Sequence, residues 1–470
     1  MRENVYAVNT PVGAVAGARR RQTGGPQAVR APGRQPGSAG QRRPVAQPGS
    51  AGQRRPVAGR EWSRLVVLGI LLSLAVVATD RMAAPVPDAV VHRLSGPDVQ
   101  RLPAVVAGVS PGRLAALPWP ATGGGAVGLA GVGLVAAGGD SNAVPIASVT
   151  KMMTADIVLA DHPLAGRSGG PEIRMTQQDV DINYEDELRD ESNVPVSDGE
   201  KLTERQVLQG LLVHSANNLA DTLARWDGGS VPAFVARMNR EAASLGLTNT
   251  RFADPSGYDP GSVSTPGDLV RLASVCMGNP AFRSIVDEPS VTLPVAGLVQ
   301  NYVSAIGRDG VVGIKSGFTN WSQGVVVLAA VRNAGGLPVT VLAAVTGQGG
   351  IDPLGSAQDV ALRLINALTP LLSEDTIVHQ GDEYGQIRVP WQRGGVPVTT
   401  AKGISLASWP GAVPSISVKL NVHRLRCGTL DSGQRIGTVT GAIGGSGASV
   451  PLIVRSAVPC PAIRWRLAHD

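Results

Sequence analysis

The sequence of this 470-residue chain predicts an α+β fold, with an antiparallel sheet assembled from segments that lie far apart in the chain. Two observations predict it. Strand-type patterns lie at both ends of residues 105–372, whereas helical patterns fill the middle. After residue 373 the pattern changes to short alternating runs punctuated by Gly and Pro, which predicts a separate β-rich domain over residues 373–470.

Four segments of the central region have the apolar, β-branched character of strands. They are residues 126–137, 310–317, 324–332 and 339–346. The last two are separated by a short Gly-Gly-Leu-Pro segment, which is typical of a hairpin connection. An antiparallel sheet is therefore expected.

Helical periodicity covers the segments between these strands and one segment after them. The expected helices are residues 149–160, 204–213, 218–226, 231–245, 265–277 and 359–368. Thr203, with Gln206 three residues later, forms a capping-box pattern that begins the second of these helices.

The C-terminal segment contains strand patterns and two of the three cysteines. The patterns cover residues 386–389, 415–422, 435–439 and 451–454. We expect Cys427 and Cys460 to form a disulfide there, as an oxidising compartment allows. Cys276 lies in an apolar helical pattern and is expected to be a small buried hydrophobic residue.

Charge is distributed unevenly along the chain. Residues 1–64 hold twelve Arg and two acidic residues, whereas the remainder holds 30 basic and 34 acidic side chains. A mildly acidic body argues against nucleic-acid binding, because such a fold needs a basic folded surface. The tail repeats the sequence QPGSAGQRRPVA at residues 35–46 and 47–58, and we expect it to be disordered.

An apolar run at residues 65–79 follows the basic tail. With its flanks it predicts a membrane anchor over residues 65–84, and a Pro-rich irregular linker over residues 85–104 follows. A cleaved signal peptide is the alternative. We favour a single-pass anchor in the cell membrane, with the arginine-rich tail in the cytoplasm and the body outside.

Three short motifs carry the chemical signal. In chain order they are Ser148-Val-Thr-Lys151, Ser215-Ala-Asn217 and Lys315-Ser316-Gly317. Each is weak alone, but the chain has only five lysines, and two of them fall in these motifs. The first motif begins a helix, the second lies between two helices, and the third ends a β-branched run.

The spacing of the first motif suits nucleophilic catalysis. A helical offset of three places Ser148 and Lys151 one turn apart on the same face. The lysine can act as a base only when it is neutral, so its pKa must fall, and burial and a nearby cation such as Lys315 would both lower it. Ser215 can relay a proton.

The remaining motif residues suit substrate binding. Asn217 can hold a peptide carbonyl and orient Lys151. Lys315 and Ser316 can bind a substrate carboxylate, which needs a positive charge and a hydroxyl donor. Gly317 allows the substrate backbone to come close.

These motifs resemble those of the penicillin-binding protein and serine β-lactamase superfamily, and most of all the low-molecular-mass D-alanyl-D-alanine carboxypeptidases. The likeness covers residues 120–370 and includes PIASVTKMMTA (145–155), FVARMNREAASLGLTNTRFADPSG (234–257), VSTPGDLVRLA (263–273) and GVVGIKSGFTN (310–320). The β-rich segment resembles the pendant domain of those enzymes. Three departures are mild: Ser316 stands where Thr is usual, Ala216 replaces Gly, and Asn218 replaces Asp.

The resemblance implies a β-lactamase/transpeptidase-like fold and a peptidoglycan stem peptide ending in D-Ala-D-Ala as substrate. It implies β-lactams as inhibitors and neither a metal nor another cofactor. Ser148 would be the acylated nucleophile, with Lys151 as its proton acceptor. The backbone N–H groups of Ser148 and Phe318 would form the oxyanion hole.

Two other functions were weighed. A β-lactamase is disfavoured because Glu241-Ala-Ala-Ser-Leu lacks the Asn expected after a deacylating Glu. A catalytically silent wall-binding homologue need not keep both lysines and both serines. His214 is expected to be structural, and the acidic run at residues 185–191 is expected to be a polar loop without a metal site.

Overall fold

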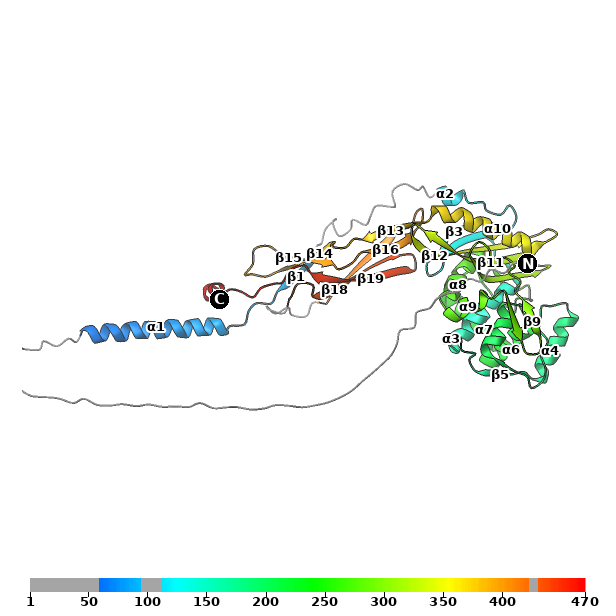
Figure 1. Ribbon diagram of the computed structural model, residues 1–470, viewed down its shortest axis with the longest axis horizontal. Helices are drawn as coiled ribbons and strands as arrows, with labels where there is room; N and C mark the ends of the chain where they lie inside the picture. The colour runs from blue at the N-terminus through cyan, green and yellow to red at the C-terminus, as the bar shows by residue number, and fades with distance from the viewer. Residues whose placement is uncertain (1–58, 94–111, 422–429, 470) are drawn as a thin grey trace, which may run out of the picture. The chain divides into compact units, whose positions relative to one another are not determined.

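A computed structural model describes residues 59–93, 112–421 and 430–469. The centre of residues 112–372 is a five-stranded sheet in the order β10-β11-β12-β2-β3, and every neighbouring pair is antiparallel. These strands are Val311–Thr319, Gln323–Ala334, Leu337–Gln348, Gly124–Leu129 and Gly133–Gly139. Strands from both ends of the region therefore pair, as predicted, and the fold is α+β (Figure 1).

The sheet is buried on both faces, and the alternation of side chains along β11 shows this. Val325 and Val327 face one apolar core, whereas Val326 and Leu328 face the other. Helix α10 (Pro353–Leu368) packs on β11 and β12. It contributes buried side chains such as Leu364 to the second core. Because both faces are covered, the strands are continuously apolar instead of alternating.

The helical middle covers the other face (Figure 1). Its helices are α3 (Lys151–Asp161), α4 (Gln177–Leu188), α5 (Glu204–Leu212), α6 (Asn217–Gly228), α7 (Val231–Ser244), α8 (Pro266–Cys276) and α9 (Pro280–Val286). The predicted capping box is confirmed, since the Thr203 hydroxyl accepts from the backbone N–H of Gln206. Cys276 is fully buried in this core, as expected.

Two predictions in this region are wrong. Residues 126–137 form a hairpin, β2 and β3, because Gly131 and Gly133 take positive φ angles at the turn. The acidic run at residues 185–191 is not entirely a loop, since helix α4 extends to Leu188. The missed signal is a capping box between Thr176 and Asp179.

Short elements complete the region. Helix α2 is Gly112–Ala115, and the paired short strands are β4 (Val144–Pro145) with β7 (Val263–Ser264), β5 (Glu172–Arg174) with β6 (Lys201–Thr203), and β8 (Ser290–Leu293) with β9 (Gly297–Gln300). The 3-10 helices are η1 (Ala147–Thr150) and η2 (Thr369–Leu371).

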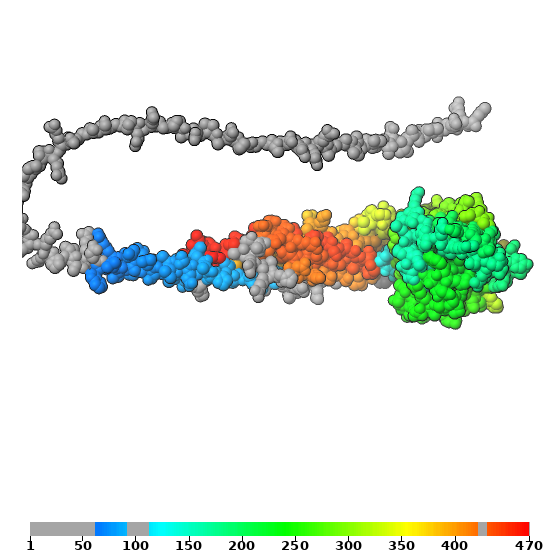
Figure 2. Space-filling view, turned by 90° about the horizontal axis from the view of Figure 1, so that it is seen from below, coloured from blue at the N-terminus to red at the C-terminus, as the bar shows by residue number. Residues whose placement is uncertain are grey.

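The C-terminal segment is a β structure with a core of its own, which includes Val398, Val439 and Leu452. The outer surface of this segment is coloured orange to red in Figure 2. Its larger sheet has the order β1-β14-β15-β19-β18-β17, and β13 pairs with β16. In that order the strands of the larger sheet are β1 (Val90–Arg93), β14 (Glu383–Arg388), β15 (Val396–Thr400), β19 (Ser446–Val454), β18 (Arg435–Ile443) and β17 (Pro414–Leu420). The other pair is β13 (Ser373–Val378) and β16 (Ile404–Ser408), and the short helix α11 (Ile463–Ala468) lies near the C-terminus.

Two expectations for the flanks of this segment have different outcomes. Strand β1 pairs with β14, so the linker over residues 85–104 is not irregular at residues 90–93. The expected disulfide lies outside the described residues because Cys427 does, and it stays a prediction.

Helix α1 (Gly59–Ala83) contains the apolar run. Its segment Trp62–Ala83 is long enough and apolar enough to cross a membrane, by length and composition, and its large apolar side chains are exposed.

One buried acid stands out in the helical core. Glu204, at the first position of α5, is fully buried, and neither of its carboxylate oxygens has a hydrogen-bond partner among the described residues. Burial raises the pKa of this carboxyl to about 7. The folded state therefore binds this proton more tightly than the unfolded state, and the group costs stability as pH rises through about 7.

We predict that Glu204→Gln stabilises the protein at pH 8 and does so much less at pH 5, where the native carboxyl is already protonated. The gain at pH 8 is of the order of 1–3 kcal/mol, or a few degrees in the midpoint of thermal unfolding. The exposed Glu187→Gln, on α4, is the control and should show no such pH dependence. Equal effects at both pH values would contradict an uncharged buried Glu204.

Candidate active site

The side-chain amine of Lys151 lies at the centre of the site. Its Nζ donates to three acceptors: Ser148 Oγ at 2.9 Å, Asn217 Oδ1 at 2.6 Å and the Ser256 carbonyl at 2.8 Å. Lys151 is completely buried, at the first position of α3. The predicted contact between Ser148 and Lys151 is therefore present.

The three acceptors are not equivalent. An amide oxygen and a backbone carbonyl can only accept, whereas a hydroxyl can also donate. When Lys151 is neutral it keeps two N–H donors for Asn217 and Ser256, and its lone pair then faces the one partner that has a proton to give. That partner is Ser148, so the geometry directs the basic lone pair at its hydroxyl.

The electrostatics of the site allow Lys151 to be unprotonated near pH 7. Burial lowers the pKa of Lys151 to about 7. The nearby carboxylates of Asp254, Glu191, Asp186 and Asp221 oppose that effect. The pKa of Lys151 therefore results from two opposing effects. Burial favours loss of its proton, and the surrounding carboxylates favour keeping it.

Backbone geometry fixes the position of Ser148. Ser148 lies in η1, directly before α3, and the preceding Ala147 has a φ of 46°, a strained value for a residue with a Cβ. Two glycines allow neighbouring segments to approach it. A Cβ at Gly317 would lie 2.7 Å from the Ser148 nitrogen, and one at Gly257 would lie 1.8 Å from the Ala147 carbonyl oxygen. Gly317 is thus required by contact with the nucleophile's own backbone.

The second motif connects α5 and α6, as predicted. Ser215 is buried and has a φ of 65°, and Asn217 is the first residue of α6. The strain at Ser215 marks a turn held by its surroundings. His214 stacks on Tyr302 with ring centroids 5.1 Å apart, and its Nδ1 lies 3.2 Å from the Gln300 carbonyl, in agreement with a structural role.

The third motif lies on β10 and supplies a second buried lysine amine. Lys315 is 1% exposed, and its Nζ donates to the Ser316 carbonyl at 3.1 Å. Burial, with the charge of Lys151 as the second cause, holds the pKa of Lys315 well below its usual range. The buried Ser316 hydroxyl has no partner among the described residues. A carboxylate would satisfy both groups.

A cleft opens over Ser148. Three of the predicted site residues line it, and the full set is Ser148, Arg189, Asp190, Glu191, Ser192, Asn217, Gly257, Tyr258, Asp259, Pro260, Phe318, Thr319, Asn320 and Trp321. The structure thus brings Ser148, Asn217 and Phe318 to one surface. Lys151 and Lys315 lie beneath it, fully buried.

Two groups at the site are not predicted by the sequence. Glu191 lines the cleft and belongs to the acidic run, which was expected to be a polar loop without a metal site. The Ser256 carbonyl belongs to a loop fixed by Asp254, which accepts from the Ser256 and Ser262 hydroxyls and from two backbone N–H groups. Asp254 and Ser256 lie within residues 234–257, one of the segments that resemble the carboxypeptidase family. That resemblance was the available sequence signal for this loop.

Glu241, the candidate deacylating residue in the β-lactamase alternative, does not line the cleft. Glu241 is on α7, where its side chain accepts from Ser244, and it is absent from the residues that line the cleft. No described side chain of α7 takes its place in that lining.

A lysine whose pKa is lowered by burial, so that its amine can be neutral near pH 7, equips a protein for acyl transfer without histidine when it is placed against a serine hydroxyl. The fold and the cleft therefore define a serine hydrolase of the lysine-dependent class.

Comparisons with known proteins identify the family within that class. The model of the D-alanyl-D-alanine carboxypeptidase family matches residues 132–346. D-alanyl-D-alanine carboxypeptidase DacB2 of Mycobacterium tuberculosis is 35% identical over 226 residues, which are 46% of this chain and 73% of that protein. A D-alanyl-D-alanine carboxypeptidase of Streptomyces is 31% identical and covers 42% of this chain and 71% of its own length. The chain belongs to the D-alanyl-D-alanine carboxypeptidase family.

A solved structure extends the likeness in fold. Penicillin-binding protein 5 from Haemophilus influenzae aligns over 75% of this chain and 100% of its own, with a TM-score of 0.52 and 20% sequence identity. This likeness supports the predicted α+β transpeptidase-type fold.

Proposed function

We propose that this protein is a serine-type D-Ala-D-Ala carboxypeptidase that removes the terminal D-alanine from peptidoglycan stem peptides through an acyl-enzyme at Ser148. The family assignment supports the activity. The observation that carries the residue roles is the hydrogen bond of 2.9 Å between the buried Lys151 amine and the Ser148 hydroxyl.

In the acylation step, neutral Lys151 takes the proton of Ser148 as its Oγ attacks the carbonyl carbon of the terminal peptide bond. The oxygen of that carbonyl becomes an oxyanion, which the backbone N–H groups of Ser148 and Phe318 would stabilise. Collapse of the tetrahedral intermediate breaks the C–N bond. The departing amine takes up a proton from Lys151, directly or through Ser215, and free D-alanine leaves.

The substrate is held by its free carboxylate. Lys315 and Ser316 bind it, because they supply a buried positive charge and a buried hydroxyl that has no other partner among the described residues. The penultimate residue then places its carbonyl over Ser148. A water molecule completes the cycle by hydrolysing the ester, with Lys151 again accepting the proton.

The first prediction from this proposal is covalent labelling by a penicillin, since a strained lactam amide imitates the terminal D-Ala-D-Ala bond. Intact-mass spectrometry should show one adduct, and peptide mapping should place it on Ser148. Ser148→Ala should abolish the adduct while the circular dichroism spectrum stays unchanged. An adduct on another residue, or none on folded protein, would contradict the assignment.

The two motif lysines should respond differently to arginine. Lys151→Arg should lower the acylation rate roughly 100- to 10,000-fold, because a guanidinium cannot serve as a base. Lys315→Arg keeps a positive charge for the carboxylate and should retain measurable turnover with a raised KM. In the wild type the rate should rise with pH through about 7, as Lys151 loses its proton. Equal losses in both variants would contradict separate roles.

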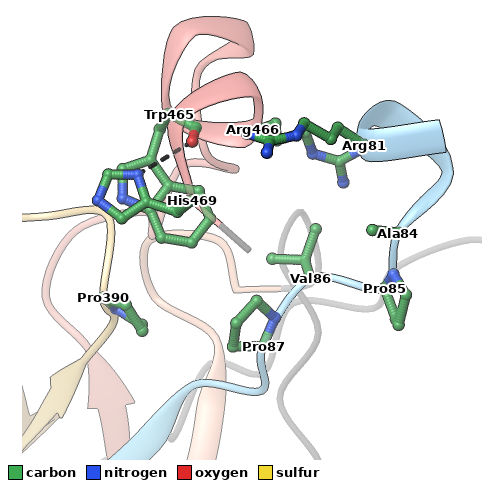
Figure 3. Close-up of a pocket in the computed structure, with 9 residues that line it drawn as sticks. All are labelled: Arg81, Ala84, Pro85, Val86, Pro87, Pro390, Trp465, Arg466 and His469. Atoms are coloured by element: carbon green, nitrogen blue, oxygen red, sulfur yellow. Dashed lines mark hydrogen bonds between the residues drawn. The ribbon is translucent and has the colours of Figure 1, made fainter. Parts of the chain in front are cut away.

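We also propose that α1 anchors the protein in the cell membrane, with the catalytic domain outside. The length and apolar composition of Trp62–Ala83 support this topology, as do the twelve arginines of residues 1–64. At the far end of that segment Arg81 and Arg466 lie beside a pocket that also includes Trp465 (Figure 3). Arginine and tryptophan are typical of the interface between lipid and water.

This topology is testable in spheroplasts of cells that carry an N-terminal tag on the protein. Added protease should degrade the catalytic domain and spare the tag, and detergent should expose both. A mature protein that begins near residue 80 would instead identify the apolar run as a cleaved signal.

A further inference from the structure

Glu191 is a buried acid in the cleft with no part in the steps above. Its side chain is 3% exposed although it follows the exposed end of α4. Its backbone is held from both sides, because its N–H donates to the Asp186 carbonyl at 2.9 Å and its carbonyl accepts from the Asn193 side chain at 3.0 Å. The side chain is therefore held in place.

The Glu191 carboxylate contacts the second catalytic motif. Its Oε2 accepts from Asn217 Nδ2 at 2.6 Å, and its Oε1 accepts from Arg189 at 3.2 Å. The next residue repeats the connection through the main chain, because the Ser192 carbonyl accepts from the Asn217 N–H at 2.7 Å. Loop and helix start are thus joined at two points.

This contact decides which way round the Asn217 amide lies. A carboxylate only accepts, so the NH₂ end of the amide must face Glu191 and the oxygen must face Lys151. In the reversed orientation an NH₂ group would oppose the Lys151 ammonium, donor against donor, while an oxygen would oppose the Glu191 carboxylate, acceptor against acceptor. Both contacts would then be repulsive.

We propose that Glu191 is a positioning residue of the reaction, which locks the Asn217 amide with its oxygen toward Lys151 and so keeps the lysine lone pair directed at Ser148. The inference rests on the proposed function, since it gives Glu191 a role only through the lysine base. If the amide were free to turn, Lys151 would lose one of its two acceptor-only partners, and its lone pair would no longer be confined to the serine.

A second consequence is electrostatic. The titratable groups that act on Lys151 are the carboxyls of Asp254, Glu191, Asp186 and Asp221, and the amine of Lys315 interacts with it electrostatically. Glu191 is one of the acids that raise the pKa of Lys151 against the effect of burial. Removing its charge should therefore lower that pKa, and the acidic limb of the pH–rate profile should move to lower pH.

The test uses the full-length chain in detergent, with a tripeptide ending in D-Ala-D-Ala and a soluble penicillin as probes. Two variants separate geometry from charge. Glu191→Gln keeps an oxygen that can accept from Asn217 but removes the charge, whereas Glu191→Ala removes both. Glu187→Gln, an exposed change of the same charge on α4, is the matched control.

We expect Glu191→Ala to lower kcat roughly 10- to 100-fold by misplacing the reacting groups, while KM stays nearly unchanged because the carboxylate-binding residues are untouched. Glu191→Gln should recover part of kcat and should move the acidic limb down by roughly 0.5–1 pH unit. Glu187→Gln should match the wild type in both respects.

If the wild type is active and both Glu191→Gln and Glu191→Ala have the same kcat and the same acidic limb as the wild type, the inference about Glu191 is wrong. The proposed function is not affected by that result. Both variants could instead lose thermal stability while kcat per penicillin-titrated site and the acidic limb of the pH–rate profile stay unchanged. Glu191 would then be only structural, and the inference would again be wrong. A wild type that neither turns over the tripeptide nor is acylated by penicillin overturns the proposed function and the inference together.

Discussion

The burial of the Lys151 amine is the constraint on which the rest of the site depends. An amine in water keeps its proton at neutral pH and is no base, so a lysine that is to act as a base must be taken out of solvent. A buried amine in turn needs a partner for each N–H, because an unsatisfied polar group is costly. Three segments far apart in the chain, at Ser148, Asn217 and Ser256, supply those partners. The fold's long-range pairing is thus what makes the base possible.

The same burial explains the glycines and the strained residues around the nucleophile. Enclosing the lysine brings β10 and the loop at Gly257 against the backbone of η1, closer than any Cβ would allow. Ala147 and Ser215 take positive φ angles where the chain must turn to present its groups. Strain of this kind persists only where surrounding structure holds it, and here that structure is the apolar core beneath α3 and α6.

The residues predictable from sequence are those whose role follows from local spacing. An offset of three on a helix fixes the Ser148–Lys151 contact, and the capping box at Thr203 fixes the start of α5. The hairpin of β2 and β3 was not predicted, because a Gly-rich apolar run has the same composition whether it forms one long strand or two short ones. Gly317 was predicted for the close approach of a substrate backbone, which stays a prediction; only the three-dimensional structure shows that β10 also passes the Ser148 nitrogen at this glycine.

Glu191 marks the limit of such prediction. The acidic run at residues 185–191 contains several carboxylates that composition cannot tell apart, and on that basis the run was expected to be a solvated loop. The end of α4 at Leu188 and the positive φ of Asp190 turn the chain inward, so that the Glu191 side chain is buried while Glu185 and Glu187 stay exposed. Four positions along the chain, from Glu187 to Glu191, separate an exposed carboxylate from one that accepts a hydrogen bond from Asn217. Spacing predicts which groups share a helix, but the path of a loop between helices decides which acid reaches the base.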